Sequence, residues 1–341
     1  KFLKFDIMAG IVSTFLMIII VLTSFRPIRR YLYYWFFKIH ILLFLGIIIS
    51  ACLHKHGSEL ATMIAVPLGL YVIDVSVRIF LFVATPRRIS SAKLVGDNYV
   101  RLFIHHFSRY SAAQHVNLYI PQVGWTEAHS FSPISNPEND TASIIIEVKR
   151  KWTKKLKKRV EEGKELTLAW IDGPFGQIDV PFFVKQKYLV FVAGGVGIAP
   201  IMSVLHTLHY HYKHKTTRAH LIWSCRAPDL LIELAEEIGQ MMNRGENLDL
   251  HLQLYHTGEG TLEIPLENAT ANTKAFFDCL TEGRPDFPQV LKDIKNDAKE
   301  NHCRKAGMFI CGSGTFRDAI LRNIPHSPNC FFNIHSESFS L

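Results

Sequence analysis

The sequence predicts a multi-domain membrane protein, with a partial α-helical transmembrane bundle of about three helices, an antiparallel β-barrel and a Rossmann-like α/β domain. Three observations predict this class. Apolar residues make up 48% of the 341 residues and concentrate in residues 1–85. Residues 86–186 contain runs in which apolar and polar residues alternate, as in half-buried strands. Residues 187–341 open with a buried strand, a glycine turn and a helix, which is the arrangement of a nucleotide-binding domain.

Three apolar runs in the first part predict membrane-spanning helices over Ile7–Phe25, Tyr31–Leu53 and Ala61–Ala84. Each has about the 20 residues that a helix needs to cross the hydrocarbon core. Arginine clusters follow the first run, in RPIRRY, and the third run, in TPRR. Because positively charged loops stay on the cytosolic side, we expect an integral protein of the plasma membrane or an endomembrane. It would contact lipid, and its C-terminal domains would lie in the cytosol.

Two histidines, His40 and His54, lie within and at the end of the second run. Fourteen residues at 100° each bring them to one helix face. At 1.5 Å per residue, they are about 21 Å apart along the helix axis. An imidazole in hydrocarbon is costly unless something binds it, so the pair indicates two haem groups stacked across the bilayer. The alternative is two interfacial histidines whose side chains reach water.

Cysteine usage and charge exclude several classes of protein. The six cysteines include no CxxC pair, so neither a disulfide scaffold nor a zinc site is expected. The formal net charge of +8 comes partly from basic residues beside the apolar runs, which suits a membrane surface better than a nucleic acid. We therefore expect no nucleic-acid partner.

The middle part predicts an antiparallel barrel followed by a basic helix. Alternation is clearest in AKLVGDNYVRLFIHH and HVNLYIPQ. A β run, SIIIEV, then leads into the basic run Lys149–Arg159, for which Thr153 is the predicted N-cap. Most of these charges are interpreted as facing solvent or the membrane. Backbone N–H groups at the start of this helix are suited to bind an anion.

The last part begins with the strand Leu189–Ala193, then Gly194, Gly195 and Gly197, then a helix expected to begin near Pro200. The pattern is GxGxxP, with proline at the place of the third Rossmann glycine. Proline is tolerated in the first turn of a helix. A bare backbone turn leading into a helix is suited to bind a pyrophosphate group.

Two later strands end in residues suited to the same ligand. AHLIWSCR ends in Arg226, which could bind a 2′-phosphate and favour NADPH over NADH. The alternative for Arg226 is an ordinary surface salt bridge. AGMFICGSG contains Cys311 and Gly312 before another helix, and ligands collect at the carboxyl ends of parallel strands. The segment Thr257–Ala306 has no motif, and we expect a surface insertion with no assigned role.

The chain resembles the ferric reductase and NADPH oxidase family in the order and approximate spacing of the motifs HSFS, DGPFG, AGGVGIAP, WSCR and FICGSG. These proteins are flavocytochromes b, in which a ferredoxin-reductase-like module is fused to a haem-bearing membrane domain. The resemblance implies membrane helices in residues 1–85, an FAD-binding barrel in 86–186 and an NADPH-binding domain in 187–341. The chain would begin at the family's fourth membrane helix, so we expect a piece of a longer protein.

The resemblance also implies roles for the motif residues. HSFS matches the family's His-Pro-Phe-Thr/Ser motif, with Phe131 beside the isoalloxazine ring, the Ser132 hydroxyl bound to the flavin, and Ser130 in place of the usual proline. The other residues implied to bind FAD are His129, Lys151, Trp152 and Thr153. The residues implied to bind NADPH are Gly194, Gly195, Gly197, Pro200, Arg226, Cys311 and Gly312.

Two positions would act in catalysis. Cys311 would lie beside the nicotinamide. Phe339, in the aromatic C-terminal ending, would cover the flavin until the nicotinamide displaces it. In the family this phenylalanine is usually the last residue, whereas Ser340 and Leu341 follow it here.

His40 and His54 match the haem-iron ligands of the family's fifth membrane helix, which implies two haem b groups. Bis-histidine ligation needs two more histidines, which the family carries on its third helix and this chain lacks. Each haem would then need a ligand from outside the chain. The alternative is a haem-free form that passes electrons to a partner.

The implied function is that of a transmembrane oxidoreductase, an enzyme that passes electrons from cytosolic NADPH through FAD and haem to an acceptor across the membrane. The family's reductase branch typically spaces the two histidines fourteen residues apart, as here, which favours a ferric chelate as the acceptor. The first alternative is a superoxide-generating NADPH oxidase, with dioxygen as the acceptor. The second is a non-catalytic, decayed reductase acting as a regulatory subunit. Regulatory subunits or an oligomer are left open.

Overall fold

The computed structural model describes residues 2–31, 33–54, 57–105, 112–124, 127–136, 141–176, 186–211, 217–243, 248–259, 264, 267, 269–324 and 331–338. The chain divides into two compact units, Lys1–Ala84 and Thr85–Leu341.

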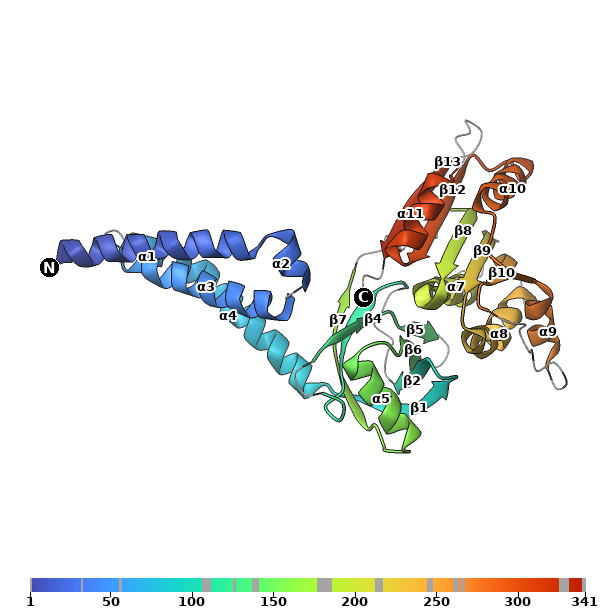
Figure 1. The fold of residues 1–341 in the computed structure, drawn as a ribbon, viewed down its shortest axis with the longest axis horizontal. Helices are drawn as coiled ribbons and strands as arrows, with labels where there is room; N and C mark the ends of the chain where they lie inside the picture. The colour runs from blue at the N-terminus through green and yellow to red at the C-terminus, as the bar shows by residue number, and fades with distance from the viewer. Residues whose placement is uncertain are drawn as a thin grey trace. The chain divides into compact units, whose positions relative to one another are not determined.

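The first unit consists of helices. They are α1 (Phe2–Thr23), α2 (Arg26–Tyr31), α3 (Tyr33–Cys52) and α4 (Gly57–Ala84). Helices α1 and α3 pack side by side (Figure 1).

Two of the described helices are long and apolar enough to cross a membrane, over Trp35–Cys52 and Ala61–Ala84. Only 6% of the first stretch and none of the second is buried in the structure, whereas the apolar face of a helix in a soluble protein packs against its core. The second and third predicted spans therefore correspond to helices with exposed apolar surfaces. The first apolar stretch is shorter, Ile7–Thr23. A turn at Ser24 ends α1 two residues before the predicted end at Phe25.

In the described part of the second unit, seven antiparallel strands form a sheet in the order β4-β3-β7-β1-β2-β6-β5. They are β1 (Arg87–Val95), β2 (Tyr99–His105), β3 (His115–Tyr119), β4 (His129–Phe131), β5 (Ile134–Asn136), β6 (Thr141–Glu147) and β7 (Leu168–Phe175). Strand β4, at one edge of the sheet, contacts β6, which is next to the other edge, although a flat sheet would separate these two strands by about 24 Å. The sheet therefore curls, and the predicted antiparallel barrel is confirmed.

Helix α5 (Lys151–Glu161) packs on this core through Trp152 and Leu156, which are buried. The prediction of Thr153 as its N-cap is wrong, because the N-cap is Arg150. Thr153 Oγ1 instead accepts hydrogen bonds from the backbone N–H groups of Lys149, at 2.9 Å, and Arg150, at 3.0 Å. From the third helical position a hydroxyl reaches back to the start of the helix, as in one half of a capping box.

A second sheet contains six parallel strands among the described residues, in the order β11-β10-β9-β8-β12-β13. Its strands are β8 (Tyr188–Gly194), β9 (Thr217–Cys225), β10 (Leu248–His256), β11 (Leu280–Glu282), β12 (Lys305–Gly312) and β13 (Phe331–Ser338). Its helices are α7 (Ile198–His211), α8 (Pro228–Asn243), α9 (Ala271–Asp278), α10 (Phe287–Glu300) and α11 (Gly314–Arg322).

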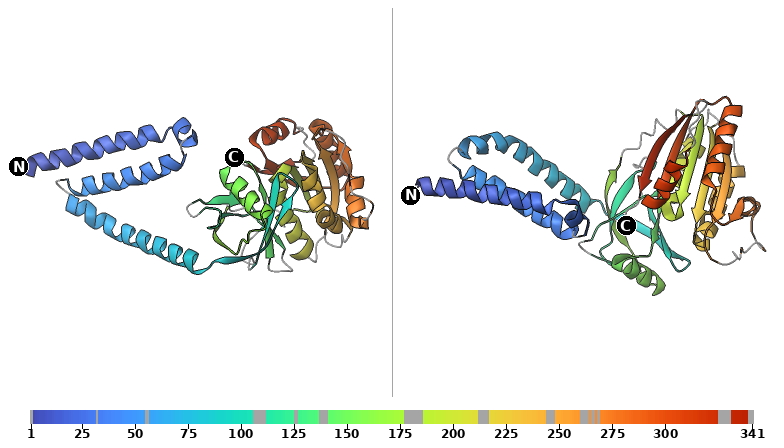
Figure 2. Two further views of the ribbon diagram at one scale, coloured as in Figure 1. Left: turned by 60° about the horizontal axis from the view of Figure 1, so that its bottom comes forward. Right: turned by 45° about the horizontal axis from the view of Figure 1, so that its top comes forward.

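Helices cover both faces of the parallel sheet (Figure 2). Helices α7, α8 and α9 contribute to one core, and α10 and α11 to the other. The chain runs outward from β8 to β11 and then crosses to β12 on the other side of β8. The strand order therefore reverses between β8 and β12, as in a doubly wound nucleotide-binding fold. This confirms the predicted α/β domain, and α7 begins two residues before Pro200.

The segment Thr257–Ala306 is not a surface insertion, so that prediction is wrong. Strand β11 pairs with β10 and extends the parallel sheet. Phe276 of α9 and Leu291 of α10 are fully buried, one on each face of the sheet. The segment carries no motif because packing against the sheet requires only an amphipathic pattern.

Candidate functional site

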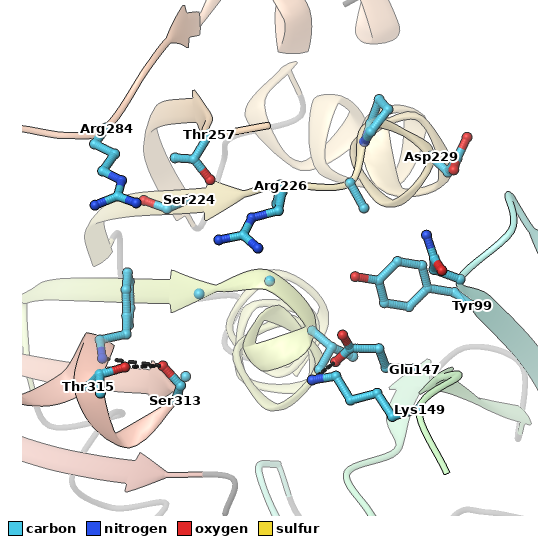
Figure 3. A pocket seen from close by; sticks show the side chains of 18 of the residues that line it. Tyr99, Glu147, Lys149, Ser224, Arg226, Asp229, Thr257, Arg284, Ser313 and Thr315 are labelled. Carbon is cyan, nitrogen blue, oxygen red and sulfur yellow. Dashed lines mark hydrogen bonds and ion pairs between the residues drawn. The ribbon is translucent and has the colours of Figure 1, made fainter. Parts of the chain in front are cut away.

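A cleft of about 1060 Å³ opens where the strand order of the parallel sheet reverses. Gly194 and Gly195, at the end of β8, line it together with Gly312, at the end of β12. Tyr99 and Lys149 of the barrel also line it (Figure 3). A ligand in this cleft would therefore contact both the barrel and the parallel-sheet domain.

The glycine turn after β8 holds the backbone of two strands close together. Gly195 has a φ of +54°, a left-handed conformation that glycine adopts readily. Trp223 Nε1 donates a hydrogen bond to the Gly195 carbonyl at 3.0 Å. A Cβ atom on Gly197 would overlap the carbonyl oxygen of Cys311 on β12. Helix α7 follows at once, with Pro200 buried in its first turn, so a pyrophosphate here would meet bare backbone and the positive end of a helix dipole.

Two arginines line the cleft from the carboxyl side of the sheet. Arg226 extends from the end of β9 into the open space, and Arg284 follows β11 (Figure 3). Ser224 and Thr257 line the cleft as well. Guanidinium groups and hydroxyls are suited to bind a phosphate. The sequence predicts Arg226 but not Arg284, because Arg284 becomes recognisable only once β11 is known to be a strand of the sheet.

The two predicted residues at the end of β12 have different surroundings. Gly312 lines the cleft, whereas the side chain of Cys311 is fully buried in the core. Burial raises the pKa of the Cys311 thiol well above its usual range, so the thiol is uncharged at neutral pH. The backbone of Cys311 contacts the glycine turn. Ser313 then begins α11 as its N-cap and accepts a hydrogen bond from Phe316 N–H at 3.3 Å.

The structure brings together the two segments implied to bind FAD. The rings of His129 and Trp152 have centroids 4.5 Å apart, and the rings of Phe131 and Trp152 have centroids 6.1 Å apart. Trp152 Nε1 is buried and has no hydrogen-bond partner among the residues that the structure describes. A buried donor without a partner is costly, so this cluster fits a flat group that carries hydrogen-bond acceptors, such as a flavin nucleotide. Lys151, by contrast, is exposed.

The HSFS motif lies on and just after β4, and a side-chain hydrogen bond ties it to β3. Ser130 Oγ donates a hydrogen bond of 2.6 Å to Asn117 Oδ1 on β3, a bond that proline could not make. Ser132 is buried. Burial lowers the pKa of His129, and the nearby Glu127 carboxylate, 3.7 Å away, only partly opposes this. Phe339 lies outside the described residues.

The two histidines of the membrane helices, His40 and His54, have different surroundings. His40 lies within α3, its Nδ1 is buried, and this atom has no hydrogen-bond partner in the described part of the chain. His54 lies two residues beyond the end of α3, and its ring lies against Gly10 of α1. Among the described residues, no three His, Cys, Asp or Glu side chains are grouped as a metal site. Imidazole is a common ligand of haem iron, so each histidine has the chemistry of one axial ligand.

Three protein-family models match the chain. They are described as a ferric reductase like transmembrane component (residues 1–51), an FAD-binding domain (residues 84–179) and a ferric reductase NAD binding domain (residues 186–324). In the solved structures, the Amycolatopsis reductase GcoB is similar in fold, with a TM-score of 0.51 and 16% identity over 74% of this chain and 69% of that chain.

Relatives carry two kinds of name. A superoxide-generating NADPH oxidase heavy chain of Dictyostelium discoideum is 25% identical over 99% of this chain and 54% of its own length. Human NADPH oxidase 4 is 29% identical over 67% of this chain and 42% of its own length. Ferric reductase transmembrane component 1 of Schizosaccharomyces pombe is 23% identical over 96% of this chain and 64% of its own length. The chain thus spans about half of the length of such relatives. With the membrane, FAD and NAD components matched in this order, the chain belongs to the ferric reductase and NADPH oxidase family.

Proposed function

We propose that the chain is a transmembrane oxidoreductase that takes electrons from cytosolic NADPH and delivers them to an acceptor across the membrane. The observation that carries the proposal is the cleft at the strand-order reversal, where a glycine turn, a helix start and two arginines line one space. When bound, the flavin accepts a hydride from a nicotinamide and releases single electrons, and haem relays them.

In this proposal, the cleft binds NADPH. The turn at Gly195 and the start of α7 hold the pyrophosphate, and Gly194, Gly197 and Pro200 shape this turn. Arg226 and Arg284 bind the 2′-phosphate, since each guanidinium offers a planar set of donors.

On the barrel, Phe131 lies beside the flavin, and the buried Trp152 supports the rings of Phe131 and His129 from the core. His129 remains neutral because burial lowers its pKa. Neutral His129 leaves one ring nitrogen as an acceptor and one as a donor. Ser130 acts by tying β4 to β3, and Ser132 is the proposed hydroxyl donor to the flavin. Lys151 and Thr153 belong to the start of α5, where Thr153 fixes the backbone that faces the pyrophosphate of FAD.

Two proposed roles concern the nicotinamide. Phe339 is the proposed aromatic cover of the flavin. Cys311 acts through its backbone, because its side chain is buried. It is therefore a positioning residue that sets Gly312 beside the nicotinamide.

For the membrane part, we propose that His40 and His54 each provide one axial ligand to a haem b. The second ligand of each haem comes from outside the described residues. We also propose that the second unit lies on the cytosolic side. The arginines that follow α1 and α4 support this under the positive-inside rule.

A ferric chelate is the proposed acceptor, on the spacing of the two histidines. Dioxygen is the second candidate, because several relatives are named NADPH oxidases. Dye reduction by NADPH in membranes tests this choice. Insensitivity to superoxide dismutase supports the ferric reductase, and sensitivity supports the oxidase. The intact glycine turn disfavours a non-catalytic role.

The proposed use of the cleft is tested by flavin reduction with NADPH and NADH in the purified chain. Arg226→Ala should raise the KM for NADPH about 10- to 100-fold, because a hydrogen bond to a charged group contributes about 1.5–3 kcal/mol. The KM for NADH should not change, since NADH lacks the 2′-phosphate. Arg284→Ala should act in the same direction. Equal KM values for NADPH in the unaltered and altered chains would refute the assignment.

A further inference from the structure

A row of alternating basic and acidic side chains joins the barrel to helix α8. Arg101 of β2 contacts Glu233 at 2.8 Å and Glu237 at 3.0 Å. On either side, Lys93 of β1 contacts Glu233 at 2.8 Å, and His206 of α7 lies 3.0 Å from Glu237. We call these five residues the charge row.

Arg101 is the buried centre of the charge row. It is 7% exposed, and its Nε and Nη2 also donate hydrogen bonds to Ser143 Oγ of β6, at 3.1 and 2.9 Å. Burial by itself would raise the pKa of Glu237, but the hydrogen bond from His206 and the charge of Arg101 outweigh it and lower the pKa to about 2. A buried charge that loses its partners is costly, so arrangements of barrel and helix that separate Arg101 from the two glutamates are disfavoured.

The charge row lies directly behind two walls of the cleft. Arg101 follows the cleft residue Tyr99 by two positions on the same strand, so both side chains point to the same face of β2. Glu233 follows the cleft residue Asp229 by four positions, about one turn of α8. The turn between β1 and β2 also touches α8, because a Cβ atom on Gly96 would overlap the Asp229 carboxylate. Movement at the charge row would therefore move one wall of the cleft against the other.

We propose that Arg101 is a positioning residue that fixes the barrel against α8 and so sets the separation between the flavin and nicotinamide sites. The proposal rests on the proposed function of the cleft. Hydride transfer requires reacting atoms about 3–3.5 Å apart, and a misplacement of about 1 Å can cost 100-fold in rate. No residue of the charge row needs to touch either ligand for this effect.

A matched control is available at the other end of the parallel sheet. Arg218 of β9 contacts Asp249 at 2.7 Å and Asp297 at 2.7 Å. It thus also pairs with two carboxylates, but all three residues belong to the parallel-sheet domain. Replacing Arg218 removes the same kind of ion-pair set, in a more exposed position, without touching the contact between the barrel and α8.

The experiment compares Arg101→Met and Arg218→Met in the full chain. Stopped-flow measurement gives the rate of flavin reduction at saturating NADPH and its deuterium isotope effect. Pulsed EPR gives the distance between spin labels at Lys154 of α5 and Lys292 of α10, which are both exposed. We expect Arg101→Met to slow flavin reduction about 10- to 100-fold, to increase the isotope effect and to broaden the distance distribution. Arg218→Met should leave the rate of flavin reduction and its isotope effect within about two-fold and should leave the distance distribution unchanged. Both variants should lower Tm.

Two results would overturn the proposal: equal rate losses in the two variants, or an unchanged distance distribution in Arg101→Met. If Arg101→Met does not fold, Glu237→Gln replaces it, because it keeps the side-chain volume and removes one charge of the row. If the unaltered chain does not oxidise NADPH, the proposed function fails. In that case, the distance distribution by itself still tests whether Arg101 fixes the barrel against α8.

Discussion

The cleft of the parallel sheet and the histidines of the membrane helices are both proposed to hold redox groups, but the chain builds them differently. The cleft takes its turn, its arginines and its barrel wall from one compact unit. The described part of the membrane unit contains two histidines, His40 and His54, fourteen residues apart in the sequence. The sheet topology brings the ends of distant strands to one edge, so a single domain completes its site. A haem site between helices needs a side chain from each facing helix.

The largest expected difference between the two regions concerns haem. The purified chain should show flavin absorbance but no low-spin haem b band in a reduced-minus-oxidised spectrum, because the described membrane helices offer one imidazole at each position. His40→Ala should leave NADPH-dependent flavin reduction within about two-fold, since the two sites are in separate units. A haem band in the purified chain that disappears in His40→Ala would contradict this expectation, because it would show that His40 is a ligand and that the second ligand comes from this chain or from a second copy of it.

The next effect tests whether the cleft depends on close backbone packing. Gly197→Val should lower NADPH-dependent flavin reduction about 100-fold and destabilise the fold by about 1–3 kcal/mol, because its Cβ would overlap the Cys311 carbonyl. The control is Gly314→Ala, since a Cβ there meets no atom within 4 Å. The measurements are stopped-flow flavin absorbance and thermal unfolding. Similar losses in both variants would contradict the packing argument.

A smaller effect appears at acid pH and concerns the charge row. The folded pKa of Glu237 is about 2, below the ordinary value of 4.5, so the ionised form stabilises the fold above about pH 4.5. This stabilisation is lost as the pH falls towards 2, and it amounts to on the order of 2 kcal/mol. Urea unfolding between pH 5 and 2.5 measures it. Glu237→Gln should show a shallower pH dependence, and an unchanged slope would contradict the assignment.

The smallest expected effect is a loss of stability at the start of helix α5, which packs on the barrel. Thr153→Val should destabilise the fold by about 1 kcal/mol, because the N–H groups of Lys149 and Arg150 lose their acceptor. Thr153→Ser keeps the hydroxyl and should retain most of the stability. Urea unfolding midpoints of the two variants give the answer. Equal midpoints would mean that water replaces the hydroxyl at no cost.

Local patterns predicted the elements that depend on neighbours in the chain. The apolar runs, the alternating strands and the glycine turn before α7 are found where hydropathy and glycine spacing indicate them. Two predictions were wrong because the same local sequence pattern is compatible with two different structures. Threonine is common at N-caps, but Thr153 is the third residue of α5, and its hydroxyl accepts hydrogen bonds from the backbone at the start of the helix. Thr257–Ala306 looked like an insertion because amphipathic helices carry no motif.

By itself the sequence determined the family, the membrane helices, the two sheet types and the glycine turn, because each follows from periodicity, composition or a short motif. Only the tertiary structure decided that Arg284 joins Arg226 at the cleft, that the Cys311 thiol is buried, and that Arg101 meets a carboxylate 132 positions away. These facts depend on which strand ends and helix turns are neighbours in space. Such pairings are selected by packing of the whole unit, which no short stretch of sequence specifies.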